Sequence, residues 1–150
     1  LSLLVQAQVS GRKWGQFNIV LGPSVAAFSL RPDEDYLSVT WCQYFAGSAS
    51  EKLRCAIEAI RDSDMHVGGK ACFCVANTDA IREAAERFGR NPSFIFYPEA
   101  DNPAHAGVHG LESPEEALLE LLADECWSEF LNKERADDLP ITNCEIAADL

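Results

Sequence analysis

The segment that most constrains the fold is Ala71–Ala76, which is apolar at every position. A strand of this kind is typical of a sheet that is covered on both faces. Amphipathic helical patterns lie on either side of it. The first opens with a capping box at Ser48–Glu51, and the second carries an apolar stripe from Ile81 to Phe88 and ends at Gly89. We therefore expect a sheet with helices on its faces.

The rest of the chain adds strands before this unit and a helix after it. Four strand-like runs come first, at Leu3–Val9, Gln16–Leu21, Val25–Leu30 and Tyr36–Phe45. Short turns between them favour antiparallel pairing. A later run at Ser93–Tyr97 completes a βαβ unit, which we expect to be parallel and right-handed. The sequence predicts an α+β (or α/β) fold with one mixed sheet, antiparallel N-terminal strands followed by βαβ units, and about three helices.

The negative charge is concentrated in the C-terminal third. The formal net charge is −12, and ten of the 12 basic and ten of the 24 acidic residues lie in Leu1–Pro98. The whole of the net charge therefore falls in Glu99–Leu150. We expect residues 1–131 to form a single globular α+β domain and residues 132–150 to form an acidic C-terminal tail or edge strand.

A surface of this sign repels phosphate backbones and anionic lipids, so we expect no direct nucleic-acid or membrane binding. It would instead speed the encounter with a basic protein partner. The candidate partner-binding residues are the acidic positions Glu116, Glu120, Asp124, Asp137 and Asp138. The alternatives are a solvated surface that only keeps the protein in solution, and mimicry of a nucleic acid.

The six cysteines lie at scattered spacings without a C-x-x-C pair. A disulfide scaffold usually has denser cysteines in a shorter chain. We therefore expect reduced, mostly buried thiols in a cytoplasmic protein. We expect no cofactor. Cys74 stands two residues before a predicted helix start, which leaves a nucleophile as an alternative to a buried core thiol.

The stretch Asn102–Gly110 contains two histidines, His105 and His109, four residues apart. On a helix this spacing can hold a zinc ion, but Pro103 and the glycines disfavour a helix. An extended chain would separate the two Cα atoms by roughly 13 Å, too far for one ion. The histidines are therefore weak metal candidates, and we expect structural roles, with His105 as a general acid or base as the alternative.

Another group of polar residues precedes Gly68-Gly69. Asp62, Asp64 and His66 stand at alternate positions and could bind a cation weakly. A solvated loop is the preferred interpretation.

Three short motifs are similar to those of known proteins. They are Phe28-Ser29-Leu30-Arg31-Pro32, Leu37-Ser38-Val39 and Asn102-Pro103-Ala104-His105-Ala106. In this order they resemble a loosely defined set of small uncharacterised bacterial proteins. The resemblance implies a compact bacterial cytosolic domain, brings no activity with it, and nominates Ser38 and His105 as residues to test.

Three functional hypotheses follow. The first is a non-catalytic interaction protein of a bacterial cytosolic complex, an accessory subunit, inhibitor or adaptor that docks through its acidic C-terminal third. The second is a small hydrolase or transferase that uses His105 with Cys74 or an acidic residue. The third is a small-ligand or metal sensor built around the Asn102–Gly110 loop.

Overall fold

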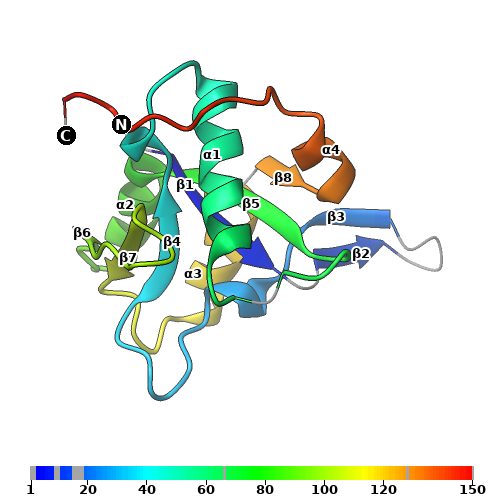
Figure 1. Ribbon diagram of the computed structural model, residues 1–150. Helices are drawn as coiled ribbons and strands as arrows, with labels where there is room; N and C mark the ends of the chain where they lie inside the picture. Colours follow the sequence, from blue (N-terminus) through cyan, green and yellow to red (C-terminus); the bar gives the residue numbers. More distant parts are fainter. Residues whose placement is uncertain (1–2, 9–10, 15–18, 66, 128, 150) are drawn as a thin grey trace.

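Two antiparallel sheets with helices on both faces make up the computed structural model (Figure 1), which describes residues 3–8, 11–14, 19–65, 67–127 and 129–149. The strands are β1 (Leu3–Gln8), β2 (Gly11–Trp14), β3 (Ile19–Pro23), β4 (Leu37–Trp41), β5 (Cys72–Asn77), β6 (Ser93–Phe96), β7 (His105–His109) and β8 (Glu129–Leu131). The helices are α1 (Ala49–Asp62), α2 (Thr78–Glu86), α3 (Glu116–Leu121) and α4 (Lys133–Asp137). Shorter turns are the 3₁₀ helices η2 (Val25–Phe28) and η3 (Cys42–Tyr44), and η4 (Leu122–Cys126), a π-helical continuation of α3.

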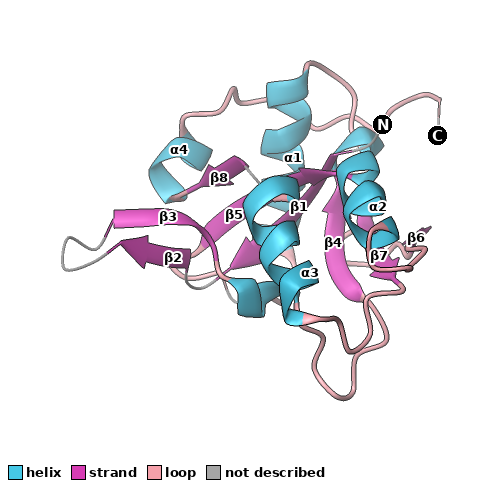
Figure 2. Cartoon of the chain, turned by 180° about the vertical axis from the view of Figure 1, so that it is seen from behind, coloured by secondary structure: helices cyan, strands magenta, loops and turns pink. Residues whose placement is uncertain are grey.

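The larger sheet has the strand order β6-β7-β4-β1-β5-β8, and β2 and β3 form a separate hairpin. Helix α1 covers one face of the larger sheet, while α2 and α3 cover the other (Figures 1 and 2). Strand β5 is buried between them as predicted: Phe73 and Val75 join the core beneath α1, and Cys74 and Ala76 join the core beneath α2 and α3. The predicted α+β fold is confirmed.

Parts of the prediction differ from the structure. Strands β5 and β6 run in the same direction, but β1, β4 and β7 lie between them, so every described neighbouring pair is antiparallel. The run Val25–Leu30, predicted as a strand, contains η2 instead. Its Phe28 is fully buried and stacks on Trp127 with ring centroids 5.2 Å apart. A short apolar run does not by itself distinguish a strand from a helical turn. The contact of Phe28 with Trp127 favours the helical turn here.

The segment 132–150, predicted as a tail or edge strand, is tied to the rest of the chain over its described residues. After α4 the chain crosses back over α1, and we call residues 138–149 the strap. Cys144 of the strap forms a disulfide with Cys55 of α1, with the Cα atoms 5.4 Å apart. An isolated antiparallel bridge joins Phe45 to Ile146, which is the one element of strand pairing in the strap.

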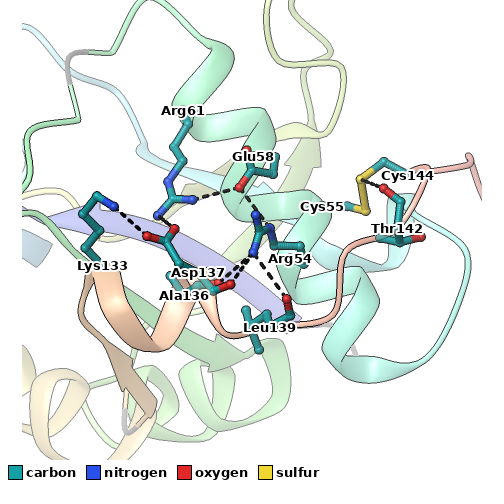
Figure 3. Close-up of polar contacts among 10 residues, drawn as sticks. All are labelled: Arg54, Cys55, Glu58, Arg61, Lys133, Ala136, Asp137, Leu139, Thr142 and Cys144. Carbon is teal, nitrogen blue, oxygen red and sulfur yellow. Dashed lines mark hydrogen bonds and ion pairs between the residues drawn. A yellow bond between two sulfur atoms is a disulfide. The ribbon is translucent and has the colours of Figure 1, made fainter.

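Two arginines of α1 hold the end of α4 and the start of the strap (Figure 3). Arg54 donates hydrogen bonds to the carbonyl oxygens of Ala136, Asp137 and Leu139 at 3.3, 2.9 and 3.3 Å. Asp137 accepts from Lys133 at 2.6 Å and pairs with Arg61 at 2.9 Å, and these partners, Lys133 first, lower the pKa of its carboxyl. Asp137 is thus neutralised within the chain, which weakens its candidacy for binding a partner.

The prediction that all the cysteines are reduced is wrong for Cys55 and Cys144. The spacing between cysteines carries no information about a pair that folding brings together from 89 residues apart. Four thiols remain free and buried: Cys42, Cys72, Cys74 and Cys126. Burial raises the pKa of Cys42 to about 12 and that of Cys126 to about 11, so both stay protonated at neutral pH. No helix in the described residues is both long and apolar enough to span a membrane.

Candidate functional site

The candidate site lies on the α1 side of the sheet, where strands β4 and β7 run side by side. Their register places Ser38 opposite Gly107 and Thr40 opposite His105. Because side chains alternate along a strand, these positions share one face, and His109 lies on the same face two residues beyond Gly107. The intervening residues of both strands face the opposite core, beneath α2 and α3.

A pocket of about 390 Å³ opens on this face. Its lining residues come from β4, the C-terminal end of α1, the loop after β6 and the start of β7: Ser38, Ser63, Asp64, Met65, Glu99, Asp101, Asn102 and His105. Three of them are carboxylates and none is a lysine or arginine. The backbone N–H of Asp64 donates to Asp101 at 2.7 Å, which joins the end of α1 to the β6–β7 loop.

His105 is held in one orientation at the wall of the pocket. The residue is 7% exposed, and its Nδ1 lies 2.9 Å from the carbonyl oxygen of Tyr97. A carbonyl only accepts, so Nδ1 carries the hydrogen and Nε2 of the neutral ring is left as an acceptor. The carboxylate of Glu99 lies 3.5 Å from the same Nδ1.

Asn102 organises the loop that carries these groups. Its backbone carbonyl accepts from the N–H groups of Glu99 and His105, both at 3.1 Å, and its side-chain Nδ2 donates to Thr40 at 2.9 Å. The other side-chain atom, Oδ1, is buried and has no hydrogen-bond partner in the described structure. An unpaired buried acceptor costs about 1–3 kcal/mol.

An aromatic group borders the pocket. The ring of Tyr36 stacks on Tyr97 at 5.2 Å between centroids and lies 5.0 Å from the His109 ring and 6.0 Å from the His105 ring. A Cβ added to Gly107 would lie 2.6 Å from the Tyr36 ring, so the ring covers this glycine directly. Burial raises the pKa of Tyr36, and the Glu99 carboxylate adds to the shift, so its hydroxyl stays protonated.

This arrangement separates the two weak metal candidates. Strand β7 is extended, and the Tyr36 ring lies over Gly107, between His105 and His109. His109 shares a hydrogen bond with the hydroxyl of Tyr97, with Nε2 3.3 Å from that oxygen. The two histidines therefore make different hydrogen bonds, and the Tyr36 ring lies between them. The described residues contain no group of three His, Cys, Asp or Glu side chains that could hold a metal, and His66 lies outside them.

The nucleophile candidate Cys74 is not part of the site. It is fully buried on the opposite face of the sheet from His105, and burial raises the pKa of its thiol well above the ordinary value. Ser38 does line the pocket with His105, but the described hydrogen bonds include none between them. The pocket thus brings together two of the nominated residues without a nucleophile–base pair.

The partner-binding candidates lie elsewhere. Glu116 and Glu120 are exposed on α3, Asp124 is exposed on η4, and Asp138 is exposed at the end of α4. Helix α3 covers the face of the sheet that is remote from the pocket (Figure 2).

Sequence reasoning missed two carboxylates of the lining, Glu99 and Asp101, and the neighbouring rings of Tyr36 and Tyr97. One signal was available. Residues 36, 38 and 40 alternate in the same way as residues 105, 107 and 109, and treating the second set as a strand would have placed both on one face. The proline and glycines around residues 105–109 concealed that strand.

Comparison with protein-family models, curated proteins and solved structures gives no match to this chain. The resemblance to small bacterial proteins stays a prediction.

Proposed function

We propose that this protein binds a small amine-bearing molecule in the pocket between α1 and the β6–β7 loop. The observation that carries the proposal is the charge of the lining: Asp64, Glu99 and Asp101 contribute carboxylates, and no lining residue is a lysine or arginine. The C-terminal end of α1, which carries the negative end of the helix dipole, supplies Ser63 to the same lining. The negative electrostatic potential of these carboxylates and of the helix end favours a cationic ligand.

The hydrogen-bonding groups support the same ligand class. In the neutral ring of His105, Nε2 is an acceptor, because Nδ1 donates to the Tyr97 carbonyl. A primary ammonium group carries three donors and no acceptor, so it matches carboxylates and neutral acceptors together. The pocket volume of about 390 Å³ lies in the range of small-molecule sites.

The tyrosine stack supports a ligand with an apolar portion as well. Tyr36 and Tyr97 are not part of the lining, but the Tyr36 ring lies 6.0 Å from the ring of the lining residue His105, and aromatic rings attract cations over their faces and methylene groups by contact. A short diamine combines both properties. The proposal is thus a specific form of the small-ligand hypothesis and involves no metal.

Calorimetric titration with 1,4-diaminobutane tests the proposal, with 1,4-butanediol and succinate as the uncharged and anionic counterparts. We expect saturable binding of the diamine only. Glu99→Gln should weaken it about tenfold, because one charge-assisted contact contributes about 1.5 kcal/mol. Glu120→Gln, the same change on the remote α3, should leave the affinity unchanged. Binding of butanediol as tightly as the diamine, or equal effects of both variants, would refute the proposal.

The redox state of the compartment in which the protein resides decides whether the titration should contain a reductant. Scattered cysteines predict a cytoplasmic protein, whereas the Cys55–Cys144 disulfide is typical of oxidising compartments. We propose an oxidising location for this reason. The titration is therefore carried out without reductant.

We propose docking of a basic protein partner as a second candidate function. Its support is the exposure of Glu116, Glu120 and Asp124 at four-residue spacing along α3 and η4, which places them on one side of the helix. We expect an affinity that falls steeply with added salt and falls further in the Glu116→Lys, Glu120→Lys double variant. Salt-insensitive binding to a partner isolated from the native host would contradict this candidate.

A further inference from the structure

Strand β6 forms one edge of the larger sheet, and both views place it at the margin of the molecule (Figures 1 and 2). It pairs with β7 on one side only. The N–H of Tyr97 donates to the carbonyl of His105 at 3.0 Å, and antiparallel alternation makes Ile95 the next residue bonded to β7. The backbone N–H and carbonyl groups of Phe94 and Phe96 therefore point away from the sheet.

The side chains of this edge are unusually apolar. Among the described residues, the exposed large hydrophobic side chains include three consecutive ones here: Ile95 at 39%, Phe96 at 44% and Tyr97 at 37%. Sheet edges are normally protected by charges, prolines or short strands. No charged residue or proline lies within Ser93–Tyr97. The opposite edge is different, because β8 includes the exposed Glu129.

The sequence of the edge is symmetric about Ile95, since Phe94-Ile95-Phe96 reads the same in both directions. A two-fold axis at Ile95 would place Phe94 of one copy opposite Phe96 of the other. The two residues of each such pair then form two hydrogen bonds through their outward-pointing backbone N–H and carbonyl groups, and the contact is the same for both copies. Aromatic pairs that lie directly opposite each other stabilise an antiparallel sheet, so a second copy supplies each phenylalanine of this edge with a favourable partner.

We propose that the chain forms a homodimer by antiparallel pairing of β6 with β6, centred on Ile95. The two sheets then become one continuous sheet. Because the axis stands perpendicular to it, both ligand pockets lie on the same face. The dimer does not depend on the proposed ligand, and each can fail without the other.

Sedimentation equilibrium of the full chain over a wide concentration range tests the dimer. We expect the wild type to dimerise and Ile95→Lys and Ile95→Glu each to be monomeric, since like charges would face each other at the axis. An equimolar mixture of the two variants should restore a dimer, because lysine then faces glutamate. The control Ile141→Lys, at an 88% exposed position on the strap, should dimerise like the wild type.

A covalent test covers the case in which a charged variant fails to fold. Ile95 and its counterpart would form a non-hydrogen-bonded pair with Cα atoms about 4.5 Å apart, within disulfide range. Ile95→Cys should therefore give a covalent dimer on mild oxidation, with no such dimer from the wild type. A monomeric wild type, a monomeric mixture of folded variants, or an Ile95→Cys chain that stays uncrosslinked would each overturn the proposal.

Discussion

Cys144→Ser is expected to lower the free energy of unfolding by about 3–5 kcal/mol. The Cys55–Cys144 bond joins residues 89 positions apart, and closing a loop of this length restricts the unfolded chain strongly. Its loss also frees the strap, which is otherwise held by the Phe45–Ile146 bridge and the contacts of α4. Urea denaturation followed by circular dichroism, without reductant, measures the difference.

Reductant provides the control for this prediction. Dithiothreitol should destabilise the wild type by the same amount and leave the variant unchanged, because the four remaining thiols of the described chain are free already. The double variant Cys55→Ser, Cys144→Ser should match the single one. Equal urea midpoints for the oxidised wild type and the variant would show that the bond contributes nothing to stability.

Arg54→Met should cost about 2–4 kcal/mol. The guanidinium donates to three backbone carbonyls, two at the end of α4 and one in the strap, and the side chain of Arg54 is only 16% exposed. Methionine keeps most of the apolar stem but leaves these carbonyls, and the Glu58 carboxylate that Arg54 contacts at 3.0 Å, without that donor. Urea denaturation with the disulfide intact measures the loss.

Arg82→Met is the matched control. Arg82 pairs with Asp79 on the surface of α2, with both side chains more than two-fifths exposed, and its guanidinium lies over the Phe94 ring at 5.2 Å. Exposed pairs and contacts of this kind contribute about 1 kcal/mol or less. If Arg54→Met and Arg82→Met lowered the free energy of unfolding by the same amount, the hydrogen bonds from Arg54 to the three carbonyls would contribute no more than an exposed ion pair.

The predictable parts of the fold are those in which the local pattern of apolar residues indicates which side chains are buried. The apolar run Ala71–Ala76 and the capped stripe of α1 predict a covered strand and an amphipathic helix, and both are present. The sheet order was not predictable, because β1 lies between β4 and β5 through contacts distant in sequence. The disulfide and the Phe28–Trp127 stack are of the same non-local kind.

The site was predictable in part. Ser38 and His105 were nominated through a resemblance, and both line the pocket. Its carboxylates come from two separate places on the surface, the turn after α1 and the β6–β7 loop, where charge is ordinarily interpreted as solvation. Glu99 and Asp101 become part of a site only because Asn102 turns the loop back onto β7. The spacing of apolar residues in a sequence does not indicate a loop of this kind.

The Cys55–Cys144 bond also turns most of the molecule into a covalent ring. Glu99, Asp101 and His105 lie inside this ring, whereas Ser38 belongs to the arm that precedes it. A protease that cut the exposed Gly68–Gly69 turn would leave both fragments tethered. A nicked molecule would keep its full mass until a reductant separated the pieces.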